Sequence, residues 1–278
     1  MANPVLNERA LKEAAGWAAP QPGTAAGEYY PPIDDGPVSA WRPGAMTVNG
    51  TLTATATLFV LLLVAAAVGW YRTGGPDVVA TPAGLEYRYA IPTMAWVGVV
   101  VGIACAIALW FKPMWARILG PVYALAEGFF LGAISRMYET FYDGIVVMAA
   151  GVTVAVFAVM LVLYRTGVIR VTDRFRQIVV TATLGIMAFY GVCLLIRLFA
   201  GADAVSFLSS SSLISIGFSV LVAGLAALNL ALDFDFIERG TQAGLDKRFE
   251  WFAAFGLLVT IVWLYLEILR LLAKLRER

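Results

Sequence analysis

Seven long apolar segments constrain this chain more than any other feature of its sequence. They span residues 51–71, 92–111, 117–137, 144–164, 177–199, 211–234 and 250–272. An α-helix needs about 20 residues to cross the hydrocarbon core of a bilayer, and each segment is close to that length. The connections are short, so the sequence predicts an all-α integral membrane protein whose seven transmembrane helices occupy residues 51–273.

The composition supports this fold class and argues against several functions. Of the 278 residues, 60% are hydrophobic and 14% are charged, whereas a soluble domain carries about 25% charged residues. The net charge of +1 and the lack of a basic patch predict no nucleic-acid partner. No nucleophile stands beside a base, Cys105 and Cys193 both lie in apolar segments, and histidine is absent. We therefore expect no enzyme activity, no cofactor and no metal site.

The lack of histidine also limits how the protein can respond to pH. Histidine is the side chain whose ordinary titration falls between about pH 5 and pH 8. Without it, a pH response in that range has to come from carboxylates in unusual surroundings.

The two ends of the chain differ from the apolar region. Residues 1–50 contain seven prolines and scattered charges, without a helical period. We interpret them as a disordered, Pro-rich cytosolic arm, with a docking segment for a partner as the alternative. Residues 274–278 are expected to form a short basic tail.

Charged residues in the loops predict the orientation, because cytosolic loops are enriched in Lys and Arg. With a cytosolic N-terminus, the outer loops hold Arg72, Arg88 and Arg136, and the loop at 165–176 is the strongest inner signal. Seven crossings place the basic C-terminus outside, against this rule, and we still expect the last helix to cross fully. The expected location is the plasma membrane of a prokaryote. The inner segments then hold twelve basic residues: Arg9, Lys12, Arg42, Lys112, Arg117, Arg165, Arg170, Arg174, Arg176, Arg239, Lys247 and Arg248.

The end of the sixth segment, LNLALDFDFIE at 228–238, carries acids at membrane depth. An ionisable residue there is by default a candidate functional site. Asp233 ends a small or polar helix face, which fits a close-packed interface, a polar path, or both. Asp233 could alternatively reach the headgroups, and Asp235 points elsewhere and is expected at the interface. The members of the face are Ser215, Ser219, Val222, Ala226, Asn229 and Asp233.

Two further acids lie at other depths. At a rise of about 1.5 Å per residue, Glu127 comes close to the midplane and Glu267 lies toward the outer side. Glu127 is expected to be protonated or paired. Glu267 could form a local ion pair with Arg270, three residues on.

Four stretches together resemble the Bax inhibitor-1/YccA family, also called TMBIM. They are PVYALAEGFFLGAIS in the third segment, ALDFDFIERG at the end of the sixth, LWFK at 109–112, and WLYLEILRLLAKL in the last. The resemblance covers roughly residues 50–275. It implies six helices around a central seventh and a pH-sensitive leak for cations, chiefly calcium. It also implies that an acid of the sixth helix pairs with one of the seventh, while a basic group of the second latches the closed state.

Carried onto this chain, Asp233 matches the first acid and Lys112 the basic latch. The second acid is where the chain departs from the family. Anchoring on Trp251 places the family position near Thr260, whereas anchoring on LYLE places it at Glu267, about two turns away in depth from Asp233. Glu127 and Asp235 are the other candidates for a second acid.

The favoured hypothesis is a pH-gated cation leak that carries calcium or protons. In it, Asp233 pairs with Lys112 in the closed state, protonation breaks that pair, Asn229 lies on the path, and Glu127 forms a stop at mid-depth. The alternative is a membrane interaction protein that restrains a membrane protease or another membrane partner through the arm or the loop at 165–176. A proton-coupled transporter is a third class, although no inverted repeat is evident.

Overall fold

The protein is described by a computed structural model that covers residues 44–81, 84–88, 92–200 and 211–278. These residues all belong to one unit of the chain, 37–278. The predicted N-terminal arm lies outside the described residues up to position 43, and the chain becomes helical from Val48.

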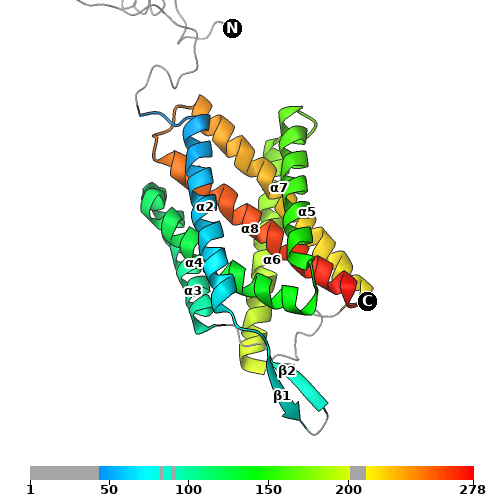
Figure 1. Cartoon of the computed structure of the whole chain (residues 1–278). Helices are drawn as coiled ribbons and strands as arrows, with labels where there is room; N and C mark the ends of the chain where they lie inside the picture. Colours follow the sequence, from blue (N-terminus) through cyan, green and yellow to red (C-terminus); the bar gives the residue numbers. More distant parts are fainter. Residues whose placement is uncertain (1–43, 82–83, 89–91, 201–210) are drawn as a thin grey trace, which may run out of the picture. The chain divides into compact units, whose positions relative to one another are not determined.

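Seven helices in the described part of the chain are long and apolar enough to cross a membrane, which confirms the predicted all-α membrane fold. Figure 1 shows their arrangement. Their bounds are α2 (Val48–Arg72), α3 (Thr93–Phe111), α4 (Ala116–Phe141), α5 (Ile145–Arg165), α6 (Asp173–Ala200), α7 (Leu213–Gln242) and α8 (Phe249–Arg276), and a short 3-10 helix, η2 (Pro113–Trp115), precedes α4.

Most of the helices are longer than the apolar segments that predicted them, and the extensions of α7 and α8 bear on the candidate site. The predicted segment 211–234 becomes α7, which continues to Gln242, and α8 continues to Arg276. Charged residues with good helix propensity extend both helices beyond the apolar core. Lys274 therefore belongs to α8 and not to the short tail that the sequence suggested.

The connection between α2 and α3 contains a β-hairpin that the sequence analysis did not predict. Strand β1 (Asp77–Thr81) pairs antiparallel with β2 (Gly84–Arg88), so that Asp77 lies opposite Arg88. β-branched residues in DVVAT favour the extended conformation.

Helices α2 and α4 pack with their backbones in close contact. A Cβ atom added to Gly128 would overlap the carbonyl oxygen of Leu62, and one added to Gly132 would overlap that of Ala66. These two glycines of α4 are four residues apart and lie on one helix face. Small residues at such positions let membrane helices approach closely.

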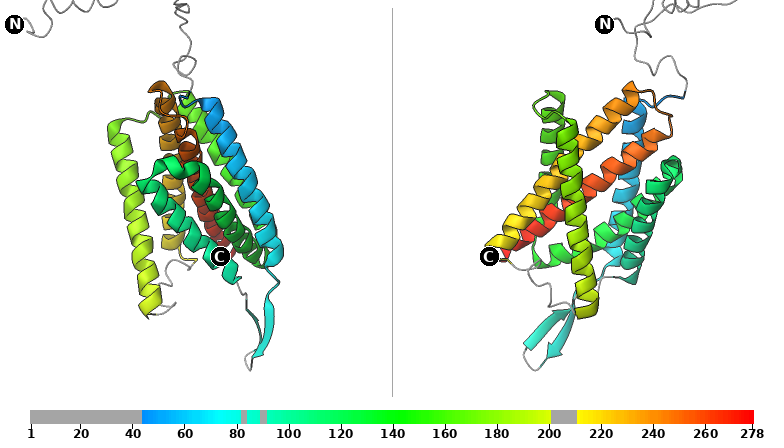
Figure 2. Two further views of the ribbon diagram at one scale, coloured as in Figure 1. Left: turned by 90° about the vertical axis from the view of Figure 1, so that its left-hand side faces the viewer. Right: turned by 180° about the vertical axis from the view of Figure 1, so that it is seen from behind.

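The last helix is the most buried of the seven. Of its apolar window, 61% is buried, compared with 44% or less for the other helices. It packs on α2, α4, α5 and α7, and Figure 2 shows α7 and α8 side by side in opposite directions. The resemblance predicts a fully central position for this helix, surrounded by the other six, and that arrangement stays a prediction.

The start of α2 is bonded to the loop between α7 and α8. Met46 N donates to Leu245 O at 2.6 Å, and Lys247 N donates to Gly44 O at 2.7 Å. The backbone N and the hydroxyl of Thr47 donate to Glu250 Oε1 at 3.0 and 2.9 Å. These contacts place the starts of α2 and α8 at the same end of the bundle.

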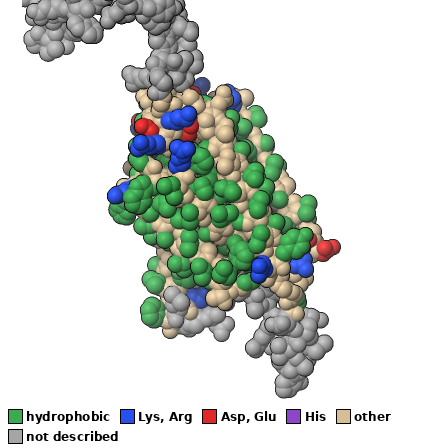
Figure 3. Space-filling view, turned by 60° about the vertical axis from the view of Figure 1, so that its left-hand side comes forward, with side chains coloured by type: hydrophobic (Ala, Val, Ile, Leu, Met, Phe, Trp, Pro, Cys, Tyr) green, Lys and Arg blue, Asp and Glu red, His purple; other side chains and the backbone are tan. Residues whose placement is uncertain are grey.

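The surface fits a bilayer. On the face drawn in Figure 3, hydrophobic side chains spread over the middle, whereas charged side chains gather toward the two ends. An apolar band between two charged ends is typical of a membrane-spanning bundle.

Candidate functional site

The antiparallel packing of α7 and α8 encloses the carboxyl group of Asp233. Its Oδ1 lies 3.6 Å from the position of a Cβ atom added to Gly256, so the glycine leaves room for the acid. Thr260, one turn further along α8, contributes a polar neighbour, and its hydroxyl donates to Gly256 O at 3.2 Å. The Asp233 Oδ2 atom is buried and has no hydrogen-bond partner within the described residues. The acid therefore points into the helix interface and not to the headgroups.

Glu267 does not join Asp233. It lies seven residues beyond Thr260 on α8, which corresponds to about 10 Å along the helix. It is almost fully buried, pairs with Arg270 at 3.1 Å, and accepts a hydrogen bond from the Tyr190 hydroxyl at 3.0 Å. The local ion pair with Arg270 is confirmed, and Thr260 occupies the level of Asp233.

Asp235 is packed against the protein, and its expected depth at the membrane interface stays a prediction. Its carboxylate is buried and accepts from Arg176 at 2.6 Å and from Arg239 at 2.8 Å. Arg239 also donates to Val171 O at 2.9 Å. The end of the basic loop between α5 and α6 thus packs on α7, a contact that the sequence analysis missed. The spacing of Asp235 and Arg239 by four residues was an available signal for half of this cluster.

The N-terminal half of the polar face of α7 binds a lysine of α8. Ser215 and Ser219 are buried, and each hydroxyl lies 2.8 Å from Lys274 Nζ, which also approaches Ser215 O at 3.4 Å. Lys274 is only 3% exposed. This buried ammonium was not predicted, because Lys274 was expected in the tail, although the stretch LLAKLR has no helix breaker.

The C-terminal half of the same face turns toward α6. Asn229 Nδ2 donates to Thr183 Oγ1 and to Leu225 O, both at 2.9 Å. The face predicted from the sequence is therefore a packed interface over its length, with Lys274 at one end and Asp233 near the other.

The end of α8 is attached to the connection between α4 and α5. Arg276 Nη1 donates to Asp143 O at 2.6 Å, and the Tyr142 hydroxyl donates to Glu277 Oε1 at 2.6 Å. Partial burial, together with the Glu277 contact, raises the pKa of Tyr142 to about 12. Tyr142 is therefore a neutral donor at ordinary pH.

Neither Glu127 nor Lys112 forms a hydrogen bond or an ion pair with Asp233 among the described residues. Glu127 lies at the α3–α4 interface, where its Oε2 is 2.8 Å from the position of a Cβ atom on Gly102. Lys112 is exposed at the end of α3 and stands 4.7 Å from the ring centre of Trp115. No ion pair between Lys112 and Asp233 occurs among the described residues, so the expected latch is not formed. Lys112 stands over Trp115 instead, although the 3-10 helix that follows it packs on α8.

These features define a class: a polytopic membrane protein with ionisable side chains enclosed between its last two helices. The chain belongs to the Bax inhibitor 1 like family, whose model matches residues 3–277. The match extends over most of the N-terminal arm, which the resemblance in the sequence had left out. No curated protein matches the chain.

Proposed function

We propose that the protein is a pH-sensitive cation leak and that ionisation of Asp233 controls its opening. The observation that carries the proposal is the buried Oδ2 atom of Asp233, which has no partner in the described part of the chain. Membrane helices rarely enclose a carboxyl group without a functional reason. The closed packing accommodates the uncharged acid, because a buried carboxylate without a partner lacks compensation for its lost hydration.

The direction of the pH response follows from this packing. An ionised aspartate at membrane depth costs about 2.5–3.5 kcal/mol on insertion scales. Loss of the proton therefore favours a state in which α7 and α8 admit water or a cation to the carboxylate. Conduction then rises with pH. This is the reverse of the direction expected from the Asp233–Lys112 pair, since that contact is not there to be broken.

The proposed path follows the interface of α7 with α8. At its inner end, Asp233 and Thr260 supply carboxylate and hydroxyl oxygens, which suit hard cations such as calcium. At the outer end, the Lys274 ammonium donates hydrogen bonds to the hydroxyls of Ser215 and Ser219. These hydroxyls are therefore not available to a passing ion. Both ends are closed in the described packing, which supports a leak that is opened by a change in helix contact.

The test is calcium flux in liposomes that contain the purified full-length protein and a calcium dye. Asp233→Asn keeps the shape of the side chain and removes its ionisation. We expect low flux from this variant across the range from about pH 5 to about pH 8. Asp143→Asn is the matched control, because it makes the same change at an exposed acid in the connection between α4 and α5, and it should keep the response of the unmodified protein. A pH response that survives in Asp233→Asn would refute the assignment.

A further inference from the structure

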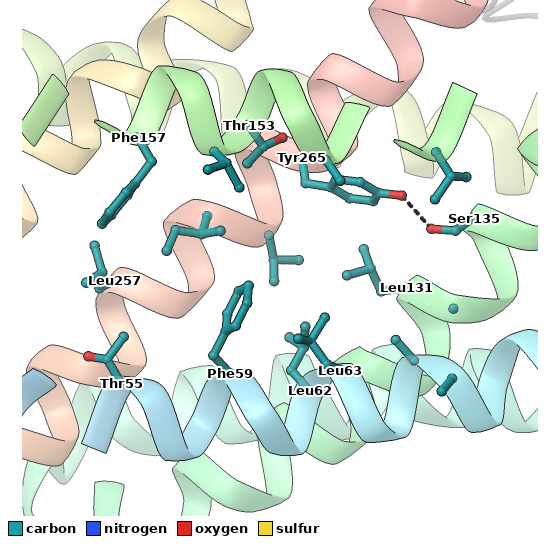
Figure 4. A pocket seen from close by; sticks show the side chains of 18 of the residues that line it. Thr55, Phe59, Leu62, Leu63, Leu131, Ser135, Thr153, Phe157, Leu257 and Tyr265 are labelled. Atoms are coloured by element: carbon teal, nitrogen blue, oxygen red, sulfur yellow. Dashed lines mark hydrogen bonds between the residues drawn. The ribbon is translucent and has the colours of Figure 1, made fainter. Parts of the chain in front are cut away.

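A long apolar cavity lies between α2 and α5, away from the buried charges. Its volume is about 650 Å³, and α4 and α8 complete its wall. Figure 4 shows Phe59 of α2, Phe157 of α5 and Leu257 of α8 around it. The size is within the range of about 300–1,000 Å³ that is usual for ligand sites.

The cavity opens toward the lipid. Leu52, Leu63 and Val154 line it, and their exposed fractions are 57%, 51% and 64%. In a bilayer these side chains face the hydrocarbon chains. An occupant can therefore enter from the side, between α2 and α5, and needs no passage through water.

The shape of the cavity favours a single chain-like occupant. On α2 its lining runs from Leu52 to Trp70, which corresponds to a length of roughly 27 Å. A groove of this length that is open along its side matches one extended acyl chain.

The hydroxyl groups in the wall are already hydrogen-bonded. Thr55 donates to Thr51 O at 2.9 Å, and Thr153 donates to Ala149 O at 2.7 Å. The hydroxyls of Ser135 and Tyr265 bond to each other at 2.7 Å, as the dashed line in Figure 4 marks. The cavity therefore offers little to water or to an ion, and its chemistry fits a hydrocarbon.

A positive charge stands at one end of this cavity. Trp70 lines that end, and the guanidinium carbon of Arg136 lies 5.2 Å from its ring centre. The Arg136 guanidinium has no acidic partner and no hydrogen-bond acceptor among the described residues. Arginine presents a fork of donors that matches phosphate oxygens, and Trp and Arg are typical of the headgroup level.

We infer that this cavity is a binding site for one membrane phospholipid, with an acyl chain between α2 and α5 and the phosphate on Arg136. The occupant comes from the bilayer, because the opening faces lipid and the charge lies at the end of the apolar groove. The site is independent of the proposed leak.

The experiment is native mass spectrometry of the full-length protein, purified in mild detergent and titrated with dioleoyl phosphatidylglycerol or with dioleoylglycerol. We expect one phosphatidylglycerol per chain. Ala150→Trp fills the groove from α5 and should abolish binding, whereas Val147→Trp places the same side chain on α5 outside the cavity lining and should not. Arg136→Gln should weaken phosphatidylglycerol binding about tenfold, the loss expected for hydrogen bonds to a charged group, and leave dioleoylglycerol unchanged. Arg197→Gln is the control for charge.

Several results would overturn the inference. The first two are a lack of stoichiometric lipid and equal lipid binding by the two Trp variants. The others are equal weakening of phosphatidylglycerol binding by Arg136→Gln and Arg197→Gln, and a protein dimer in place of the lipid adduct. A phosphatidylglycerol with a photoreactive acyl chain keeps the site testable if Ala150→Trp does not fold. Crosslinks should then concentrate in residues 52–70 and 146–157, and labelling spread evenly over α6 would contradict the site.

Discussion

At the scale of residues, two aspartates of one helix have opposite environments. Asp235 is held between Arg176 and Arg239, whereas the carboxyl of Asp233 is enclosed beside Gly256 and Thr260. A fully paired carboxylate mainly fixes structure, whereas an unpaired one can change state when its proton leaves. The difference assigns a structural role to Asp235 and leaves Asp233 as the candidate switch.

The buried Lys274 allows a test of how a charge is accommodated in the membrane. Ser219→Ala removes one of its two hydroxyl partners and leaves the ammonium less well bonded, so we expect the free energy of unfolding to fall by about 1.5–3 kcal/mol. Lys274→Met removes the charge together with its need for partners, and the freed serines can bond to their own helix. We expect its effect to be smaller. Thermal unfolding in detergent measures both, and the opposite order would contradict the role of the two serines.

At the scale of elements, the contact of α2 with α4 depends on glycine. Gly132→Ala places a methyl group on the backbone of Ala66, where no side chain can move away, and should destabilise the protein by about 1–3 kcal/mol or more. Gly151→Ala on α5 meets no atom within 4 Å and should be neutral or slightly stabilising. The two unfolding temperatures, compared under one detergent condition, provide the check. A Gly132→Ala protein as stable as Gly151→Ala would contradict the close packing.

The sequence predicted the helices well because apolar length alone determines a membrane span. The predicted segment 92–111 differs from α3 by one residue, whereas α7 exceeds its prediction by eight residues at its end. Hydropathy measures where a helix is apolar, but it does not detect a helix that continues through charged residues. For the same reason, the helical position of Lys274, which lies beyond the last apolar segment, was not predicted.

The candidate site was only partly predictable. The helical period identified Asp233 and the serines of its face, since that pattern is local. The partners were harder to find, because they depend on which helices meet. Lys112 was chosen by resemblance and forms no ion pair with the acid among the described residues, whereas Arg176 reaches Asp235 through a loop whose path no local pattern records.

At the scale of the whole molecule, α8 begins beside the start of α2 and ends beside the start of α7. It therefore runs from one end of the bundle to the other, which agrees with the full crossing expected for the last helix, and the side of the membrane on which each end lies stays a prediction. The contacts of Arg276 and Glu277 with the α4–α5 connection support this position.

Single cysteines can test this topology directly. Cys105 and Cys193 are buried and free, so their background labelling should be low. We expect a membrane-impermeant maleimide to label Arg278→Cys in intact cells and Asn49→Cys only after lysis. The reversed pattern would contradict the orientation, and labelling of both positions under the same condition would contradict the crossing of α8.

The central claim is that ionisation of Asp233 opens the protein to cations. With histidine absent, a pH response between about pH 5 and pH 8 has to come from carboxylates. The most direct measurement is the ratio of calcium flux at the upper end of this range to that at the lower end, for the unmodified protein and for Asp233→Asn in matched liposomes. The account predicts a ratio of about tenfold or more for the unmodified protein and a ratio close to unity, at low flux, for the variant. Equal ratios in the two proteins, or a flux that falls as pH rises, would contradict it.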